Sequence, residues 1–417
     1  MRYRMVNPRA AEGWPTPDRG CRPGCCLWQF VAKDSGDHQP IKDVLVLSYW
    51  NLNQAWFGGA TRIHALLRML GESLTLLQPG PAHPHWPSVT YRPDFGRKKL
   101  GINWGMFNFV WPTTWWRVRR WIKQHRPTVV VATSIWTYLP LHGLRRCPPV
   151  VLDAHDVLGN AIAERYGDRH LFTRCVRAYE RRVLARMAHV FVCSDLDRGA
   201  FIERYGLAAE NVTTVPNGVD AATWRNVHET LADVDPELDQ QLAGRTTLFF
   251  MGKLDYQPNG EALAFLLDEL MPVLEREAAG QYQLLICGGG SPQRAFGPGV
   301  HFTGRVPDIR PYVLRADLCL APIFSGSGTR LKILEYLAAG KPVIATPKGA
   351  EGITGLTSDH IRLADRTAFA MAIMEWAGTA TAEQVGQAAR EWVAQRYDWQ
   401  VVAQGWRRVL ARYHLYD

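Results

Sequence analysis

The chain of 417 residues lacks any apolar run long enough to form a membrane-spanning helix, which needs about 18 to 20 such residues. No continuous apolar stretch follows the arginines near its beginning either, so the sequence does not predict a secretory signal. Cysteine is sparse, with eight residues, and five stand singly in apolar surroundings, as is typical of buried thiols in a reducing compartment. These five are Cys147, Cys175, Cys193, Cys287 and Cys319. We therefore expect a cytoplasmic protein.

Patterns that would indicate a metal, a phosphate-binding P-loop or a nucleic acid are also missing. Cys21, Cys25 and Cys26 have no second ligand pair at a familiar spacing, and no cluster of Asp, His and Cys has the spacing of a metal site. No Gly-Lys-Ser/Thr follows a glycine-rich loop, since Gly340-Lys341-Pro342 ends a predicted helix. No basic tail of the kind that binds nucleic acid occurs. We expect no bound metal, no cofactor and no nucleic-acid partner.

What the chain does have is an uneven charge. Residues 1–205 hold 29 Lys and Arg against 15 Asp and Glu, whereas residues 206–417 hold 19 against 24. A basic first half and a mildly acidic second half are typical of two domains that meet different partners.

Apolar strands alternate with amphipathic helices in both halves. The first series contains "KDVLVLSYW", "TVVVATS", "PVVLDAHD" and "AHVFVCS", and a second begins with "TTLFFMGKL" near residue 245. Such alternation predicts an α/β fold with two Rossmann-like, doubly wound parallel-sheet domains facing each other across a cleft. We expect a disordered or miscalled extension at 1–40, an N-terminal domain at 41–220, a C-terminal domain at 245–395 and a helix at 396–417. This last helix is expected to pack back on the N-terminal domain.

The stretch "SGSGTRLKILEYLAAGKP", residues 325–342, lies between a predicted strand and a predicted helix. Ligands bind at the carboxyl ends of such strands. Small residues allow the backbone to approach a ligand, free N–H groups and Arg330 favour an anion, and Glu335 can accept bonds from hydroxyl groups. An anion with hydroxyl groups indicates a nucleotide or a sugar phosphate. An ordinary loop with Arg330 on the surface explains this stretch equally well when it is taken alone.

The second half resembles the retaining nucleotide-sugar glycosyltransferases of family 4, which have the GT-B fold. The resemblance depends on an ordered series that begins at "VPNGVD" and continues through "FMGKLDYQPN", "LLICGGG", "HFTGRVPDIRPYVLRADLCLAP" and "SGSGTRLKILEYLAAGKPVIATPKGAEG". The first half matches only in its plan, through Gly58-Gly59 and "DAHD" at 153–156.

This resemblance implies a role for each matching residue. Glu335 would bind the ribose or sugar hydroxyls of the donor, and Lys253 its diphosphate. The first glutamate of the family's pair falls on Ser327, and a second family lysine falls on Pro258, so we infer that Arg330 supplies the missing charge. The remaining predicted donor-binding residues are Gly59, Gly304, Arg305, Val306, Ser327, Gly328 and Thr329.

The resemblance implies that catalysis needs no protein nucleophile, because the donor phosphate helps to deprotonate the acceptor. Stabilisation of the leaving group is then the main requirement, and we assign it to Lys253 and Arg330. Many members place a histidine after a strand of the first domain, where this chain has Ser134. His155 is the nearest substitute, oriented by Asp156, although a structural hydrogen bond explains this pair equally well.

A second distinctive stretch, residues 104–127, is rich in tryptophan and cations and has no acid. From Thr113 onward we expect a helix in which Val118 and Ile122 pack inward. The aromatic loop at 104–111 and the cations are typical of a segment that lies on an anionic membrane surface. The alternative is a packing helix whose exposed face happens to be basic.

The resulting hypothesis is a glycosyltransferase that moves a sugar from a UDP- or GDP-sugar to a lipid-linked or cell-envelope polysaccharide acceptor, peripheral on the membrane through 104–126. Two alternatives remain: a sugar-nucleotide 2-epimerase of the same fold, and a non-catalytic scaffold with a decayed donor site.

Overall fold

The computed structural model describes residues 44–53, 58–71, 74–91, 109, 111–225, 236–290, 296–326 and 328–413. The predicted extension at 1–40 and most of the aromatic loop at 104–111 lie outside the described residues. Ser327 also lies outside them.

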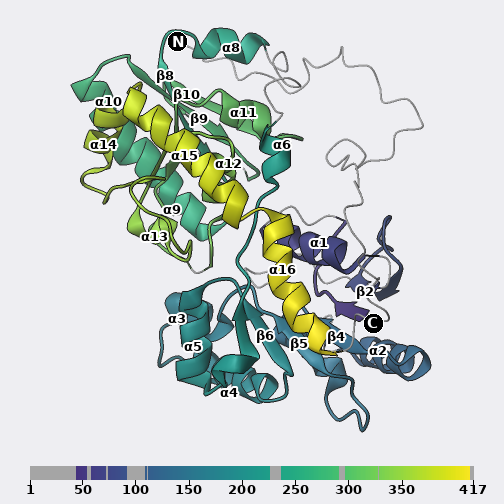
Figure 1. The fold of residues 1–417 in the computed structure, drawn as a ribbon. Helices are drawn as coiled ribbons and strands as arrows, with labels where there is room; N and C mark the ends of the chain where they lie inside the picture. Colours follow the sequence, from purple (N-terminus) through teal and green to yellow (C-terminus); the bar gives the residue numbers. More distant parts are fainter. Residues whose placement is uncertain are drawn as a thin grey trace. The chain divides into compact units, whose positions relative to one another are not determined.

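Among the described residues, seven parallel strands form a first sheet in the order β3-β2-β1-β4-β5-β6-β7 (Figure 1). Its strands are β1 (Val44–Leu47), β2 (Leu74–Pro79), β3 (Ser88–Tyr91), β4 (Val129–Ala132), β5 (Val150–Asp153), β6 (His189–Val192) and β7 (Val212–Thr214). Its helices are α1 (Gly58–Leu70), α2 (Pro112–His125), α3 (Leu158–Tyr166), α4 (Leu171–Leu184) and α5 (Asp195–Tyr205), with the 3-10 turns η3 (Ile135–Leu141) and η4 (Ala209–Asn211). The short helix α6 (Ala221–Arg225) follows, and its Trp224 packs in a core of the second sheet.

Helices cover both faces of this sheet because central strands such as β1 and β4 are apolar at every position. In β1, Val44 and Val46 pack in a core that includes α1, whereas Leu45 and Leu47 pack in a core that includes α2. Successive side chains of a strand point to opposite faces, so a continuous run of Val and Leu supplies both cores.

A second sheet has six parallel strands in the order β10-β9-β8-β11-β12-β13. Its strands are β8 (Thr246–Met251), β9 (Tyr282–Cys287), β10 (Val300–Gly304), β11 (Leu318–Ala321), β12 (Val343–Ala345) and β13 (Arg362–Leu363). Its helices are α8 (Pro236–Leu242), α9 (Gln257–Phe265), the π turn η5 (Leu266–Leu270), α10 (Met271–Glu277), α11 (Arg310–Leu314), α12 (Leu331–Ala338), α13 (Pro347–Ala350), α14 (Phe369–Trp376) and α15 (Ala380–Arg396). The chain continues through α16 (Trp399–Leu410) and η6 (Ala411–Tyr413).

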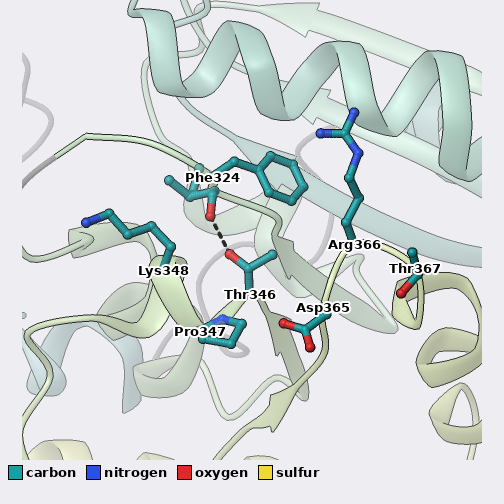
Figure 2. A pocket seen from close by; sticks show the side chains of 8 residues that line it. Phe324, Thr346, Pro347, Lys348, Asp365, Arg366 and Thr367 are labelled. Atoms are coloured by element: carbon teal, nitrogen blue, oxygen red, sulfur yellow. Dashed lines mark hydrogen bonds between the residues drawn. The ribbon is translucent and has the colours of Figure 1, made fainter. Parts of the chain in front are cut away.

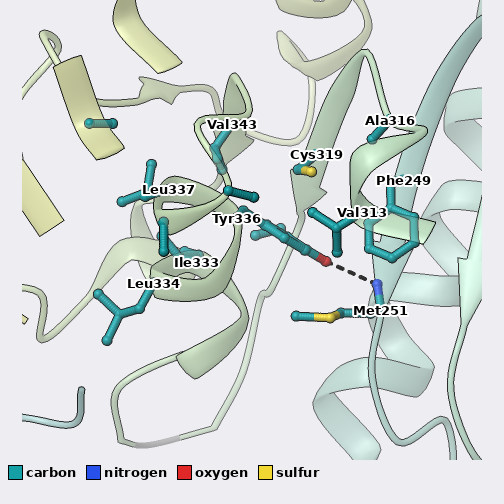
Figure 3. Close-up of a cluster of buried hydrophobic side chains, with 14 of the residues drawn as sticks. Phe249, Met251, Val313, Ala316, Cys319, Ile333, Leu334, Tyr336, Leu337 and Val343 are labelled. Carbon is teal, nitrogen blue, oxygen red and sulfur yellow. Dashed lines mark hydrogen bonds between the residues drawn. The ribbon is translucent and has the colours of Figure 1, made fainter. Parts of the chain in front are cut away.

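The side chains of α12 anchor this helix in one core of the second sheet. Ile333, Leu334 and Leu337 are buried among strand residues such as Phe249 (Figure 3). Tyr336 is also buried, and its hydroxyl oxygen accepts a hydrogen bond from the Met251 N–H at 3.0 Å. This buried tyrosine ties α12 to the end of β8, where a ligand would bind.

The chain crosses between the two sheets twice, and the two crossing segments are hydrogen-bonded to each other. The Val219 N–H donates to the Tyr397 carbonyl oxygen at 2.8 Å, and the Trp399 N–H donates to the Val219 carbonyl oxygen at 3.1 Å. After the second crossing, α16 packs with α1 in a core of the first sheet.

A buried ion pair joins this crossing region to the first sheet. Arg62 of α1 and Asp153 of β5 are both fully buried, with Nη2 2.7 Å from Oδ1. Nη1 of Arg62 also donates to the Val215 carbonyl oxygen at 2.7 Å, and Trp406 of α16 donates to Asp153 at 3.2 Å. Because an unpaired charge here would be strongly destabilising, the pair holds α1, β5, the first crossing segment and α16 together.

The two doubly wound parallel sheets confirm the predicted fold class. The expectation that all five single cysteines are buried is confirmed for Cys193, Cys287 and Cys319. It is wrong for Cys175, which is exposed on α4, and Cys147 is only half-buried. Cys175 lies on the solvent face of this amphipathic helix, between the buried Thr173 and Val176.

Candidate functional site

The order of the second sheet reverses between β8 and β11. From β8 the chain moves out to β9 and β10 on one side, and it later fills β11, β12 and β13 on the other. In an open parallel sheet, ligands bind outside the carboxyl ends of the two strands at such a reversal. The segments that begin there are 252–256, after β8, and 322–330, after β11.

The loop that follows β11 is folded around the Arg330 guanidinium. Its Nη1 donates to the Gly328 carbonyl oxygen at 2.8 Å, and its Nη2 donates to those of Gly326 and Ser325 at 2.7 and 3.1 Å. Gly326 and Gly328 have φ angles of 90° and 81°, which residues with a side chain rarely adopt. Burial lowers the pKa of Arg330, but a guanidinium stays charged at neutral pH. Arg330 therefore shapes the loop and places a positive charge at the edge of the sheet.

The segment after β8 brings Lys253 to the same edge. The Lys253 ammonium is largely exposed and lies 3.5 Å from an Asp255 carboxylate oxygen. Asn259 of α9 donates from Nδ2 to the Lys253 carbonyl oxygen at 3.0 Å. Glycine is required beside it, because a Cβ at Gly252 would lie 2.7 Å from this amide, and one at Gly288 would lie 1.8 Å from the Gly252 carbonyl oxygen.

The first turns of α12 carry a lysine and a glutamate, Lys332 and Glu335, both half-buried. The Lys332 ammonium donates to Asn259 Oδ1 at 2.8 Å and lies 4.3 Å from the centroid of the Phe250 ring. Burial lowers the pKa of Lys332 to about 7; Arg330 lowers it further and Glu335 opposes the shift. Burial raises the pKa of Glu335 to about 7, with Lys332 opposing. Burial at the switch point thus favours the neutral forms of both Lys332 and Glu335.

The third segment of this edge follows β10, two strands away from β8. Gly304 has a φ of 70°, and its carbonyl oxygen accepts from the Gly288 N–H at 2.8 Å. Arg305 is exposed and Val306 is half-buried. The backbone of 304–306 therefore lies at the same end of the sheet as Lys253.

The first sheet reverses its order between β1 and β4, and Gly58-Gly59 begins α1 just after β1. A Cβ at Gly59 would lie 2.8 Å from the Trp50 ring and 3.1 Å from His155 Nδ1, so only glycine fits there. Ser134, which follows β4, accepts from the Trp136 N–H at 3.4 Å and caps η3.

His155 is half-buried beside this glycine. Its Nε2 has no hydrogen-bond partner among the described residues, and the carboxylate oxygen Asp153 Oδ2 lies 3.9 Å away. Burial lowers the pKa of His155 to about 4, with Arg62 lowering it further and Asp153 opposing. The expectation that Asp156 orients His155 is wrong, because the neighbouring carboxylate is that of Asp153. Asp156 is itself perturbed, since burial raises its pKa to about 6.

Residues from both sheets meet beside these loops. A Cβ at Gly58 would lie 2.7 Å from Leu331 Cδ1, and Thr329 Oγ1 donates to the Cys193 carbonyl oxygen at 3.4 Å. The start of α12 is therefore in contact with the loops that follow β1 and β6.

A separate cavity of about 440 Å³ opens beyond β11 and β12, lined by Phe324, Thr346 and Lys348 on one side and by Asp365 and Arg366 on the other (Figure 2). None of the residues that the sequence assigns to the donor lines it. Because Phe324 belongs to the 322–330 segment, the cavity shares this segment with the candidate site.

Within the described parts of the chain, no group of three or more His, Cys, Asp and Glu side chains is arranged to hold a metal ion. The absence of a metal requirement stays a prediction.

The α2 helix forms a different surface. Val118 and Ile122 are buried as predicted, whereas Trp111 and Trp116 are 47% and 58% exposed. The Arg120 guanidinium lies 5.0 Å from the Trp116 ring. Two further residues of this stretch have structural roles, and the predicted membrane contact is wrong for them: Phe109 is fully buried, and Arg119 donates to carbonyl oxygens of η3 and its cap.

None of the helices in the described ranges combines the length and apolar character needed to cross a bilayer.

Two family models match the chain. The description "Glycosyl transferases group 1" matches residues 245–378, and "Glycosyltransferase Family 4" matches residues 58–223. This chain belongs to the family 4 glycosyltransferases. The glycosyltransferase is 27% identical to a phosphatidyl-myo-inositol mannosyltransferase of Mycobacterium leprae, over 70% of this chain and 75% of that protein.

Solved structures agree on the fold of this glycosyltransferase. It matches a sucrose-phosphate synthase from Thermosynechococcus elongatus with a TM-score of 0.67 and 20% identity, over 89% of this chain and 100% of that one. It matches Anabaena HepE in complex with UDP with a TM-score of 0.65 and 16% identity, over 89% and 100% of the two chains. The fold is therefore GT-B.

The structure places the residues assigned to the donor in two groups. Lys253, Gly304, Arg330 and Glu335 lie at the carboxyl edge of the second sheet, and Gly59 and His155 lie beside the first. Sequence reasoning missed Lys332 and Asn259. The only signal was the position of Lys332 on the exposed side of an apolar helix, which an ordinary surface lysine shares.

Proposed function

We propose that this glycosyltransferase moves a sugar from a nucleoside diphosphate sugar, with UDP or GDP as the nucleotide, to a lipid-linked or envelope-glycan acceptor with retention of configuration. The observation that carries the proposal is the β8–β11 switch point, where the cations Lys253 and Arg330, tight glycine loops and the Glu335 carboxylate follow neighbouring strands. Phosphates need positive charge and close backbone approach, whereas sugar hydroxyls need an acceptor, and this edge offers all of them.

Each group has a proposed part in holding the donor. Lys253 and the Arg330 loop, with Gly328 and Thr329, place positive charge and backbone N–H groups against the diphosphate. Glu335 accepts hydrogen bonds from ribose or sugar hydroxyls. The backbone of 304–306 contacts the base, and Gly59 approaches the diphosphate from the first sheet.

The proposed reaction breaks the bond between the anomeric carbon and the diphosphate oxygen while the acceptor hydroxyl attacks on the same face. The departing diphosphate takes the hydroxyl proton, so no protein base is required. Cations fixed in the site stabilise the charge that develops on the leaving group. Neutral His155, whose Nε2 has no hydrogen-bond partner among the described residues, contacts the sugar.

Two observations support a lipid acceptor. By its name, the relative from Mycobacterium leprae acts on phosphatidyl-myo-inositol. In addition, α2 exposes Trp116 next to Arg120 and Lys123, which suits the surface of an anionic bilayer. The enzyme would then act as a peripheral protein on the cytoplasmic face.

A transfer assay tests the proposal. Radiolabelled UDP- and GDP-sugars are incubated with the protein and with vesicles that contain phosphatidylinositol or an isoprenoid phosphate, without added metal. We expect the label of one nucleotide's sugars to enter the lipid fraction, with the donor's anomeric configuration preserved by NMR. Conversion of the donor to its epimer without an acceptor would support the epimerase, and failure to bind any nucleotide would support the scaffold.

A further inference from the structure

Lys332 lies at the centre of the β8–β11 switch point, although none of the roles assigned above includes it. It is the second residue of α12, which begins at Leu331 directly after the Arg330 loop. Its ammonium lies against the Phe250 ring of β8 and is held by Asn259 of α9. The Lys332 ammonium, which α12 carries, is therefore in contact with both β8 and α9.

Asn259 connects this ammonium to the Lys253 segment. Its Oδ1 accepts from Lys332 at 2.8 Å while its Nδ2 donates to the Lys253 carbonyl oxygen at 3.0 Å. The amide thus orients the Lys332 side chain toward the segment after β8. An ammonium has three N–H donors, and no acceptor other than Asn259 is found for this one among the described residues. The remaining donors are available to a ligand.

The guanidinium of Arg330 is used differently. Three of its N–H···O bonds run to carbonyl oxygens of its own loop, at Ser325, Gly326 and Gly328. A phosphate that took these donors would leave the carbonyl groups of a glycine-rich loop without partners. The guanidinium is thus a structural part of the loop.

Resting on the proposed function, we propose that Lys332 binds the diphosphate of the donor directly, and that Arg330 is a positioning residue that holds the loop in shape. The neighbouring charges favour this division. Without a ligand, the half-buried ammonium is opposed by desolvation and by Arg330 and supported by Glu335. A bound diphosphate would place negative charge next to the ammonium and stabilise its charged form.

This assignment has a pH signature. The charged groups that act on the Lys332 ammonium are Arg330 on the loop and Glu335 on α12. On the other elements that pack here, Glu261 of α9 accepts from Gln257 and Ser325, and Lys253 after β8 lies beside Asp255. Because the pKa of Lys332 is lowered to about 7, the ammonium loses its proton as pH rises through 7. Affinity for the diphosphate is therefore present below pH 7 and falls above it.

The test measures calorimetric binding of UDP, GDP, UMP and GMP to the wild type and to Lys332→Gln. For the nucleotide that the wild type prefers, Lys332→Gln should weaken diphosphate binding about tenfold or more, as expected for loss of a charged hydrogen bond. Binding of the matching monophosphate should change much less. Lys332→Arg should retain affinity at pH 8.5, where the wild type has lost much of it, because arginine stays charged.

Lys341→Gln is the matched control. Lys341 is another half-buried lysine of the same half of the chain, and its ammonium donates to the Leu314 carbonyl oxygen at 2.6 Å. We expect its nucleotide affinity to be unchanged, whereas Arg330→Gln should weaken mono- and diphosphate binding alike. Unchanged diphosphate affinity in folded Lys332→Gln, or equal losses for both ligands, would overturn the inference while the proposed function stands. A wild type that binds no nucleoside diphosphate would overturn the proposed function as well.

Discussion

At the scale of single residues, the candidate site holds two groups, Lys332 and Glu335, whose protonation changes near neutral pH. Burial raises the pKa of the Glu335 carboxyl to about 7, so this group is divided between its two forms under ordinary conditions. Only the ionised form is a pure acceptor for donor hydroxyls. Protonation of Glu335 at acid pH is therefore expected to lower the activity.

Glu335→Gln should therefore keep the fold and lose about 100-fold or more in turnover, because a misplaced donor disables a reaction that depends on orientation. In the wild type, kcat/KM for the donor reports the free enzyme. It should fall as pH drops below 7, since protonation removes the carboxylate. Steady-state rates from pH 5.5 to 8 would show this acid limb, and it should be missing in Glu335→Gln. Wild-type turnover in the variant would contradict the assignment.

At the scale of elements, α2 differs from the other helices of the first sheet. Only Thr114, Val118 and Ile122 among its residues are buried, so a narrow stripe packs on the sheet and the remaining surface is aromatic and basic. The absence of acids along it favours an anionic partner. Packing explains the buried stripe, and it does not require the exposed Trp116.

Changing Trp116 to Ser together with Arg120 and Lys123 to Glu should sharply reduce sedimentation with phosphatidylglycerol vesicles. In the wild type, added salt should weaken this binding, because exposed charges are screened over about 8 Å at physiological ionic strength. A control with the same change in charge, Arg396→Glu with Arg408→Glu on α15 and α16, should bind as the wild type does. Equal binding by the α2 variant would leave α2 as a packing helix alone.

At the scale of the whole molecule, groups from both sheets surround the first turn of α12. Leu331 contacts the start of α1, and Thr329 is bonded to the segment after β6. A ligand held at the β8–β11 edge would therefore stabilise a large part of the chain. That stabilisation can be measured without knowing the acceptor.

A nucleoside diphosphate at a hundredfold excess over its Kd should stabilise the folded protein by about 2.7 kcal/mol. For domains of 150–250 residues, this corresponds to a rise of several degrees in the melting midpoint. In a panel of UDP, GDP, ADP, CMP and NAD, we expect either UDP or GDP to raise the midpoint. No shift with any nucleotide, in a protein shown to be folded, would contradict the proposed donor site.

The sequence by itself determined the fold class and the place of the glycine-rich loop between β11 and α12. Continuous apolar runs such as β1 and β4 can only be buried on both faces, and their alternation with helices requires parallel sheets. The sequence did not predict short strands such as β7, with three residues, and β13, with two. So few side chains show no periodicity from which a strand could be recognised.

Only the tertiary structure decided which charged groups face the site. Lys332 and Asn259 are 73 positions apart, and their hydrogen bond exists because β8 and β11 are neighbours in the sheet. The same packing turned the Arg330 guanidinium toward its own loop and put Asp153, rather than Asp156, beside His155. The direction of a side chain depends on what surrounds it in space, and the order of residues along the chain does not contain that information.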